Sequence, residues 1–258
     1  MAAITLQGLS KVYRSRAYPQ GLIALDNVSL TVADREFVCL LGPSGCGKTT
    51  VLNVLSGLDQ QYVGEVRVAG NSLARKSAHP FRIGYVFQEP RLLPWLTVRG
   101  NIEFALGSSS IHRSEWRDRI NFWLSRVELV DFDRAHPHEL SGGMQQRTAI
   151  ARAFAVDPEL LLMDEPFSGL DELTARSMRE LLLGLWQETR KTVLFVTHNC
   201  FEACFVADRI VVLSPRPGRI AAEISVELPR PRDYENPHLF EQSVMITRLV
   251  TGRATSAT

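Results

Sequence analysis

The chain has almost no net charge, no long apolar run and few cysteines. Its 258 residues include 29 Lys and Arg against 28 Asp and Glu, a formal net charge of +1. Dedicated nucleic-acid surfaces usually show a strong basic excess, so we expect no nucleic-acid partner. No apolar run approaches the roughly 18–20 residues that span a bilayer. The first residues also lack the basic and apolar segments of a signal peptide. We therefore expect a cytosolic chain that reaches a membrane only through a partner.

Four cysteines, Cys39, Cys46, Cys200 and Cys204, suit a reducing compartment and do not form a disulfide framework. His198 lies close enough to the last two to raise the alternative of a metal site. A structural zinc site normally has four ligands, and no second pair of ligands lies at a suitable spacing. We therefore favour buried free thiols and expect no metal other than that of a nucleotide.

One segment fits the phosphate-binding loop pattern G-x-x-x-x-G-K-[ST] without a mismatch. It consists of Gly42, Pro43, Ser44, Gly45, Cys46, Gly47, Lys48 and Thr49. The apolar run 37–41 before it is typical of a buried parallel strand. Glycines let the backbone N–H groups turn inward around phosphate oxygens. Lys48 would contact the β- and γ-phosphates and Thr49 would offer its hydroxyl to Mg²⁺. We place Thr50 in the same site.

An acidic pair, Asp164 and Glu165, follows the apolar run 160–163. Both carboxylates are therefore expected at the C-terminal end of a strand, where α/β proteins bind ligands. An aspartate there can hold the magnesium shell, and the glutamate beside it can polarise the attacking water. An isolated pair would more often be a solvated acidic turn, but the phosphate loop upstream favours the catalytic interpretation.

The pattern of apolar residues predicts alternating strands and helices. Strands are expected at 4–9, 24–32 (with a turn at Asp26-Asn27), 36–41, 65–69, 83–87, 160–163, 192–197, 209–213 and 219–224. Helices are expected from Thr49 to Gly57, around 178–185 and over 237–250. The segment 89–159 is predicted to be mainly helical, because Trp116, Ile120, Trp123, Val127 and Val130 form an amphipathic stripe. The expected class is α/β with a largely parallel sheet.

A second glycine-rich segment, Leu140-Ser141-Gly142-Gly143-Met144-Gln145-Gln146-Arg147, lies about a hundred residues after the phosphate loop. With both motifs and Asp164-Glu165-Pro166, the chain resembles the nucleotide-binding subunit of ATP-binding cassette (ABC) transporters over roughly residues 4–226. The resemblance implies a P-loop NTPase (RecA-like) core with a mixed, largely parallel sheet and an antiparallel β part near the N-terminus. It divides the chain into an ABC domain at 1–226, with a helical subdomain inserted at about 89–159, and a C-terminal extension at 227–258. The extension would hold a short helix and a frayed tail.

The resemblance also implies how two copies cooperate. Residues 140–147 correspond to the family's signature motif, in which Ser141 and the amides of Gly142 and Gly143 would face the ATP of the other protomer. A helix begins there and offers an anion-binding end. Two ATP molecules would then be closed between the subunits of a two-fold homodimer.

Other site residues are carried over from the family where this sequence matches. Tyr13 would stack on adenine, although a lone tyrosine is more often an ordinary half-buried one. Gln88 resembles the glutamine that contacts Mg²⁺ and water and senses the transmembrane partner. The segment 168–171 resembles the loop that couples the two sites. His198 resembles the histidine that contacts the γ-phosphate and supports Glu165, but Asn199 replaces the aspartate that usually follows it.

Two further hypotheses concern the phosphate loop and the subfamily. Cys46 lies near a helix N-terminus, a setting that lowers the pKa of a thiol. We therefore expect its alkylation to block hydrolysis and bound ATP to protect it, unless the thiol is merely tolerated there. The segments 88–98, 213–220 and 228–233 are similar to those of nitrate, sulfonate and taurine importers. The prolines and arginines of the last two segments are also typical of a rigid, solvated surface strap, and both interpretations can hold at once. The implied partners are an integral membrane permease, docked at the apolar segment 92–102, and indirectly a solute-binding protein. The implied location is peripheral, at the cytoplasmic face of the inner membrane.

Alternatives remain open on the sequence alone. A soluble ABC ATPase of DNA repair or translation would share the motifs, but usually carries a second cassette or a coiled-coil insertion. A binding-only regulatory cassette would be expected to lack Glu165 or His198. An importer of a pyrimidine precursor or an aromatic acid would use a similar cassette. The ATPase does not touch the solute, so its sequence does not identify it.

Overall fold

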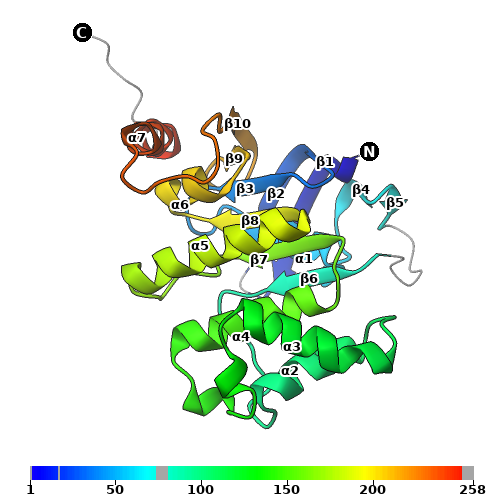
Figure 1. Ribbon diagram of the computed structural model, residues 1–258. Coiled ribbons are helices and arrows are strands. Elements are labelled where there is room, and N and C mark those ends of the chain that lie inside the picture. The colour runs from blue at the N-terminus through cyan, green and yellow to red at the C-terminus, as the bar shows by residue number, and fades with distance from the viewer. Residues whose placement is uncertain (1, 17, 74–80, 252–258) are drawn as a thin grey trace. The chain divides into compact units, whose positions relative to one another are not determined.

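The computed structural model describes residues 2–16, 18–73 and 81–251 (Figure 1). The chain divides into two compact units, one formed by residues 1–79 and 192–258 and the other by residues 80–191. The phosphate loop and His198 belong to the first unit. Gln88, the signature segment and the acidic pair belong to the second. The tail predicted to be frayed, 251–258, lies outside the described residues except for Thr251, which is helical.

The first unit contains an antiparallel sheet with strand order β2-β1-β4-β5. Its strands are β1 (Ala2–Ser15), β2 (Tyr18–Ala33), β4 (Val63–Val68) and β5 (Asn71–Ser72). The expected turn at Asp26-Asn27 is wrong, because β2 continues through it. Asn27 has φ 54°, and the pairing between β1 and β2 shifts register around it. Asparagine tolerates this left-handed conformation, so the local signal marks an irregularity within a long strand and not its end.

The first unit also contains the strand order β10-β9-β3-β8. The strands are β3 (Phe37–Leu41), β8 (Thr192–Thr197), β9 (Arg209–Leu213) and β10 (Ile220–Ser225). β3 is parallel to both β8 and β9, and β10 is antiparallel to β9. Every residue of β3 and β8 is buried, as their uninterrupted apolar sequences predict.

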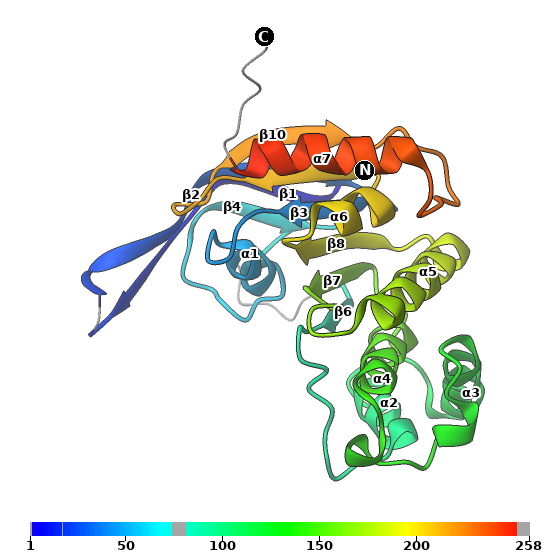
Figure 2. The same cartoon turned by 90° about the vertical axis from the view of Figure 1, so that its left-hand side faces the viewer.

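The described part of the first unit also contains three helices. α1 (Lys48–Leu55) follows β3, α6 (Cys200–Val206) follows β8, and α7 (Pro237–Thr251) closes the described chain. Figure 2 shows α7 beside α6, and the two helices pack against each other. Asn236 caps α7, since its Oδ1 accepts a hydrogen bond from the His238 N–H at 3.0 Å.

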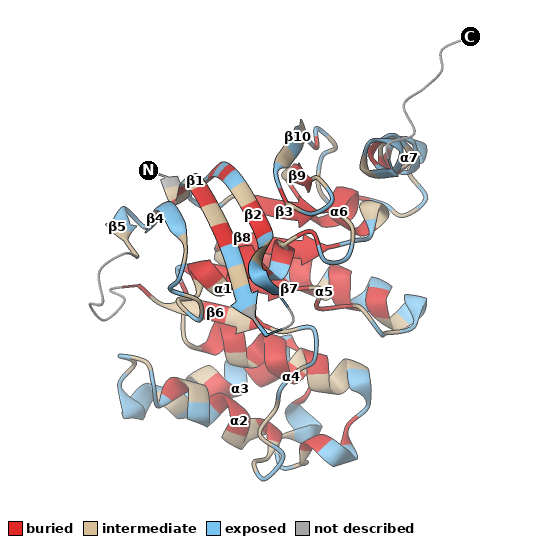
Figure 3. Cartoon of the chain, turned by 180° about the vertical axis from the view of Figure 1, so that it is seen from behind, coloured by how far each residue is buried: buried red, intermediate tan, exposed pale blue. Residues whose placement is uncertain are grey.

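The second unit combines two parallel strands with a group of helices. The strands are β6 (Ile83–Val86) and β7 (Leu160–Asp164). Between them lie α2 (Val98–Leu106), η1 (Arg113–Glu115), α3 (Trp116–Arg126), η2 (Val130–Phe132), η3 (Pro137–Glu139) and α4 (Gly142–Ala155), and α5 (Glu172–Thr189) follows β7. Figure 3 shows α4 largely in the colour of buried residues.

The amphipathic stripe is shorter than the sequence suggests. Ile120, Trp123 and Val127 are buried, but α3 ends at Arg126 and Val130 is 58% exposed in a separate 3-10 turn. Glu128, with φ 58°, breaks the helix between them. Among the described helices, none is both long enough and apolar enough to cross a bilayer.

Candidate active site

The phosphate loop leaves the C-terminal end of β3 and leads directly into α1. Gly45 and Gly47 have φ values of +77° and +106°, which side chains rarely allow. A Cβ at Gly47 would also lie 2.6 Å from Leu25 Cδ2 and 2.9 Å from the carbonyl oxygen of Ala24. Gly47 is the N-cap residue of α1 and supplies no side-chain cap. The first turn of α1 therefore suits an anionic ligand.

Lys48 curls back over the loop that precedes it. Its side chain is buried, and its Nζ donates to the carbonyl oxygens of Gly42 at 2.8 Å and Pro43 at 3.1 Å. This holds the ammonium group against the loop. Thr49 is exposed, whereas Thr50 is buried. The two residues thus present different faces of α1.

Cys46 is packed inside the loop. It is 1% exposed, and a Cβ at Gly42 would lie 2.8 Å from its Sγ. The expectation that a reagent reaches this thiol directly is therefore not supported in this conformation. Burial, with smaller contributions from neighbouring charges, also raises the pKa of Cys39 well above its usual value and that of Cys204 to about 12. No metal-binding cluster of His, Cys, Asp or Glu occurs among the described residues.

Tyr13 lies next to the start of α1. Its hydroxyl donates to Thr50 Oγ1 at 3.3 Å, and Lys11 Nζ lies 4.7 Å from the centre of its ring. The residue is half-buried in β1. The structure thus brings together Tyr13 and the helix that follows the phosphate loop.

His198 follows β8 at the same sheet edge as the phosphate loop. Leu41 pairs with Thr197 in the parallel ladder, so Gly42 and His198 both emerge where their strands end. His198 is exposed, and Asn199 caps α6 by accepting a hydrogen bond from the Glu202 N–H at 3.0 Å. Asparagine and aspartate are about equally good N-caps, so Asn199 can cap α6 in place of the aspartate that is usual in the family.

In the second unit, the acidic pair occupies a strained strand end. Asp164 is buried, and Glu165 has φ 44°. The carbonyl oxygen of Glu165 accepts from the Ser168 N–H at 3.1 Å and from Ser168 Oγ at 2.8 Å, which holds this conformation. Left-handed non-glycine residues are uncommon and cluster at functional sites. Burial and then the Asp164 carboxylate raise the pKa of Tyr85.

Gln88 follows β6 at the same edge as the acidic pair. Val86 pairs with Met163 in the parallel ladder, so the two loops leave adjacent strand ends. The Gln88 side chain is exposed.

The loop that contains Gln88 is held by polar side chains that sequence reasoning missed. From α4, Gln146 Nε2 donates to the carbonyl oxygen of Phe87 at 3.4 Å. Arg152 donates to the carbonyl oxygens of Pro90 at 2.8 Å and Arg91 at 2.9 Å. In the sequence, the one indication of these contacts is that Gln146 lies inside the signature segment.

Asn101 fixes the next part of that loop from α2. It is fully buried, and its side chain accepts from the Leu93 N–H at 2.8 Å. Its Nδ2 donates to the carbonyl oxygens of Leu93, Leu96 and Thr97 at 3.0–3.3 Å. This single side chain orders the turns of residues 92–97, which belong to the apolar segment 92–102 that was predicted to dock the permease.

The signature segment forms the N-terminus of α4. Ser141 is the N-cap residue and accepts a hydrogen bond from the Met144 N–H at 3.3 Å. Ser141 and Gly142 are exposed, and Gly143 is half-buried. The first N–H groups of a helix lack carbonyl partners within it, so this end suits an anion. Asp171, in the segment 168–171, caps α5 in the same way.

Comparisons with known proteins agree with these features. A family model described as "ABC transporter" matches residues 25–168. A putative ATP-binding protein of Brucella abortus is 48% identical over 212 residues, covering 82% of this chain and 80% of that protein. The nitrate import ATP-binding protein of Synechocystis sp. is 41% identical, and the match covers 92% of this chain and 91% of that protein. The aliphatic sulfonates import ATP-binding protein of Bacillus cereus is 39% identical, and the match covers 89% of this chain and 88% of that protein.

Solved structures give the same result. A dimeric ATP-binding cassette in a post-hydrolysis state, bound to ADP and Pi, has a TM-score of 0.76 and is 34% identical. The match covers 88% of this chain and 100% of the chain in that structure. A second dimeric structure, a bacterial ABC transporter cassette, has a TM-score of 0.77 and is 35% identical over the same shares. These matches confirm the predicted P-loop NTPase fold, with its parallel and antiparallel strands and its helices.

Proposed function

This chain belongs to the ABC transporter family as one of its ATP-hydrolysing subunits, and on that premise we propose that it powers solute import through a membrane permease. The observation that carries the proposal is the phosphate loop. It combines glycines in left-handed conformations, a buried Lys48 held on loop carbonyls and a helix without a side-chain cap. This arrangement suits a polyphosphate.

We propose that the loop residues 42–50 hold the phosphates of ATP and that Tyr13 stacks on adenine. By the family pattern, the Thr49 hydroxyl, the Asp164 carboxylate and the Gln88 amide would hold Mg²⁺, because oxygen ligands suit this hard cation. When bound, Mg²⁺ would supply positive charge that offsets the charge of the phosphates. The exposed hydroxyl of Thr49 and the buried carboxylate of Asp164 support these roles.

We propose that Glu165 activates the attacking water, which adds in line to the γ-phosphorus as ADP leaves. Ser168 holds the backbone of Glu165 in a strained left-handed conformation. This supports the proposed role, because activating a water requires the carboxylate in one fixed position. His198 would donate to the γ-phosphate and support Glu165. Gln88 would contact the water and respond to the permease. Each of these roles follows the family pattern, and each residue emerges at the end of a parallel strand.

The active assembly is proposed to be a homodimer. Ser141, Gly142 and Gly143 of one subunit would close the ATP site of the other. The exposed N-terminus of α4 and the dimeric state of both similar cassettes support this arrangement. ATP binding would close the dimer, and hydrolysis would reopen it.

The subunit is proposed to act peripherally at the cytoplasmic face of the inner membrane. The segment 92–102 would receive a cytoplasmic helix of the permease. Within it, Trp95 is 70% exposed while Asn101 holds the backbone, so an ordered loop carries an exposed aromatic side chain. A solute-binding protein would deliver solute on the opposite side.

The proposed solute class is nitrate, sulfonate or taurine. The sulfonate and nitrate import proteins among its relatives support this class. A chromosomal deletion should be tested for growth on sulfate, alkanesulfonates, taurine, ammonium and nitrate as single sulfur or nitrogen sources. Loss of growth on one organic sulfur source or on nitrate, restored by wild type but not by Glu165→Gln, is the expected result. Unchanged growth on all of them would contradict this solute class and favour a pyrimidine precursor or an aromatic acid.

A further inference from the structure

α6 is a short helix placed directly after the proposed γ-phosphate ligand His198. It spans Cys200–Val206, only about two turns. Isolated helices of this length are unstable in water, so its stability must come from caps and packing. Its N-terminus is capped by Asn199, the residue next to His198. The position of His198 therefore depends on how firmly α6 is held.

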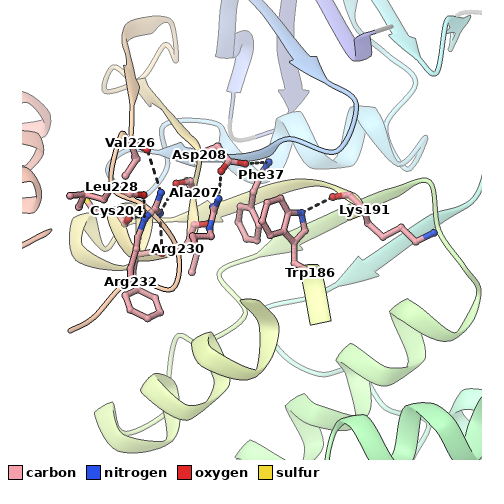
Figure 4. A network of polar contacts seen from close by, with 12 residues as sticks. Phe37, Trp186, Lys191, Cys204, Ala207, Asp208, Val226, Leu228, Arg230 and Arg232 are labelled. Atoms are coloured by element: carbon pink, nitrogen blue, oxygen red, sulfur yellow. Dashed lines mark hydrogen bonds and ion pairs between the residues drawn. The ribbon is translucent and has the colours of Figure 1, made fainter. Parts of the chain in front are cut away.

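The C-terminal end of α6 is capped by two arginines of the C-terminal extension (Figure 4). The Ala203 carbonyl still accepts a hydrogen bond from the Ala207 N–H. Arg232 Nη1 donates to the carbonyl oxygens of Cys204 at 2.8 Å, Phe205 at 3.0 Å and Ala207 at 2.6 Å. Arg230 Nη2 donates to the remaining one, Val206, at 2.5 Å. All four carbonyls that the helix itself leaves unpaired thus accept from these two side chains.

Arg232 is built into this position. Its side chain is 7% exposed, and its other nitrogens donate to the carbonyl oxygens of Leu228 at 3.1 Å and Val226 at 3.3 Å. Burial, and then the charge of Arg230, lower the pKa of Arg232 to about 10, so it remains a cation at neutral pH. A positive charge at the C-terminal end of a helix is favourable. The planar fork of arginine reaches several carbonyls at once, which a lysine ammonium cannot do.

The same extension contacts α6 and β3 in two further ways. Tyr234 packs its ring against Phe205, at 4.2 Å between centroids, and against Phe201, at 5.5 Å. Arg230 pairs with Asp208, whose Oδ2 accepts from the Phe37 N–H at 2.9 Å. Phe37 begins β3, the strand that ends at the phosphate loop. The extension is thus tied to β3, which leads to the phosphate loop, and to α6, which follows His198.

We propose that Arg232, assisted by Arg230, is a positioning residue that sets the place of His198 through α6. The C-terminal extension would then control the rate of γ-phosphate cleavage without touching the nucleotide. This inference rests on the proposed function of His198. It adds a role for the segment 228–233, whose proline and arginine residues otherwise read as a solvated surface strap.

The test is steady-state ATP hydrolysis by the purified full chain with Arg232→Met. We expect kcat to fall roughly tenfold or more, because small misplacements of a catalytic group are costly. The KM for ATP should stay within about twofold, because the loop that binds phosphate is unchanged. Arg248→Met is the matched control, since Arg248 lies exposed on α7 of the same extension. It should keep wild-type kcat.

Arg232→Lys covers the case in which Arg232→Met does not fold. It keeps the charge but loses the fork, so we expect an intermediate loss of roughly two- to fivefold in kcat. A folded Arg232→Lys or Arg232→Met protein with wild-type kcat would overturn the proposal. So would a raised KM with unchanged kcat, or an equal loss in Arg248→Met.

A double-mutant cycle separates positioning from general destabilisation. In a His198→Ala background, assayed in single turnovers with excess protein, Arg232→Met should cause no further loss of rate. If the two losses multiply, Arg232 does not act through His198 and the proposal is wrong. If His198→Ala shows no detectable turnover, amide hydrogen exchange of residues 199–206 in Arg232→Met decides. Faster exchange there than in Arg248→Met is expected, and equal exchange would contradict the proposal. Absence of ATP hydrolysis by wild type would instead refute the proposed function.

Discussion

Replacing Asp59 by Asn should destabilise the protein far more than replacing Glu65 by Gln, although both carboxylates form ion pairs of the same length. Lys11 Nζ lies 2.6 Å from Asp59 Oδ1, and Arg67 Nη2 lies 2.6 Å from Glu65 Oε1. The side chains of the first pair are 3% and 17% exposed, and those of the second are 50% and 41% exposed. Burial is therefore the main difference between the two pairs.

The size of the stability loss in Asp59→Asn follows from the partner that Lys11 would lose. In Asp59→Asn its buried ammonium keeps the Gln61 carbonyl oxygen at 2.6 Å and the Tyr13 ring but has no counter-charge. Breaking a buried pair from one side costs about 3–5 kcal/mol of the free energy of unfolding. Breaking an exposed pair costs about 0.2–1 kcal/mol. Replacing both Lys11 and Asp59 by apolar residues should recover much of the loss.

Urea denaturation at pH 7, followed by tryptophan fluorescence, measures both losses. The acid dependence gives a second check. Burial alone would raise the pKa of Asp59, but hydrogen bonds from Lys11 and the Gln61 N–H, with the charge of Lys11, outweigh it and lower the pKa. A lowered carboxyl pKa stabilises the fold above the unfolded value, about 3.9, and that stability disappears as the pH falls through the folded value. Equal losses of unfolding free energy in Asp59→Asn and Glu65→Gln would contradict this expectation. So would an Asp59→Asn protein whose stability falls at acid pH as that of wild type does.

Three further changes test local features of the site. Asn199→Ala should lose about 0.5–2 kcal/mol of unfolding free energy because the α6 cap is removed, while Asn199→Asp should match wild type in urea denaturation; equal losses would contradict the capping role. Tyr13→Leu should weaken ATP binding in calorimetry by the roughly 1–3 kcal/mol of a lost base–aromatic stack, whereas Tyr13→Phe should bind normally; unchanged affinity in Tyr13→Leu would exclude stacking. Asn101→Leu should cost at least about 1–3 kcal/mol, because buried backbone groups of the segment 92–97 lose partners; urea denaturation identical to wild type would show that the hydrogen bonds contribute nothing.

Most of the first unit could be predicted from the sequence because its strands are continuous apolar runs. The expected strands at 192–197 and 209–213 match β8 and β9 residue for residue. The phosphate loop was placed correctly between β3 and α1, since the glycine pattern and the apolar run before it agree. Local rules sufficed there because burial and backbone conformation favour the same structure.

Predictions failed where a local signal competed with the tertiary structure. Asn27 resembles a turn residue but sits inside β2, because the strand pairs with β1 on both sides of it. α6 was not anticipated, since its short sequence contains two of the cysteines considered for a metal site. Its caps come from Asn199 and from arginines more than twenty residues later, and such distant partners leave no local pattern.

The roles of Arg232 and Asn101 were missed for the same reason. Each is a polar residue whose importance lies in the backbone carbonyls around it. Sequence shows the donor but not the acceptors, because those acceptors are main-chain groups common to every residue. A buried arginine in a proline-rich segment therefore looked like a surface residue.

Light scattering of Glu165→Gln with saturating MgATP shows whether ATP closes a homodimer of this chain. We expect a particle of twice the 28.9 kDa chain mass, with ATP retained and turnover nearly abolished. Adding Ser141→Arg to this variant should return it to a monomer, because the arginine would obstruct the end of α4 that closes the partner's site. A Glu165→Gln protein that binds ATP but stays monomeric, or that hydrolyses ATP like wild type, would contradict the account.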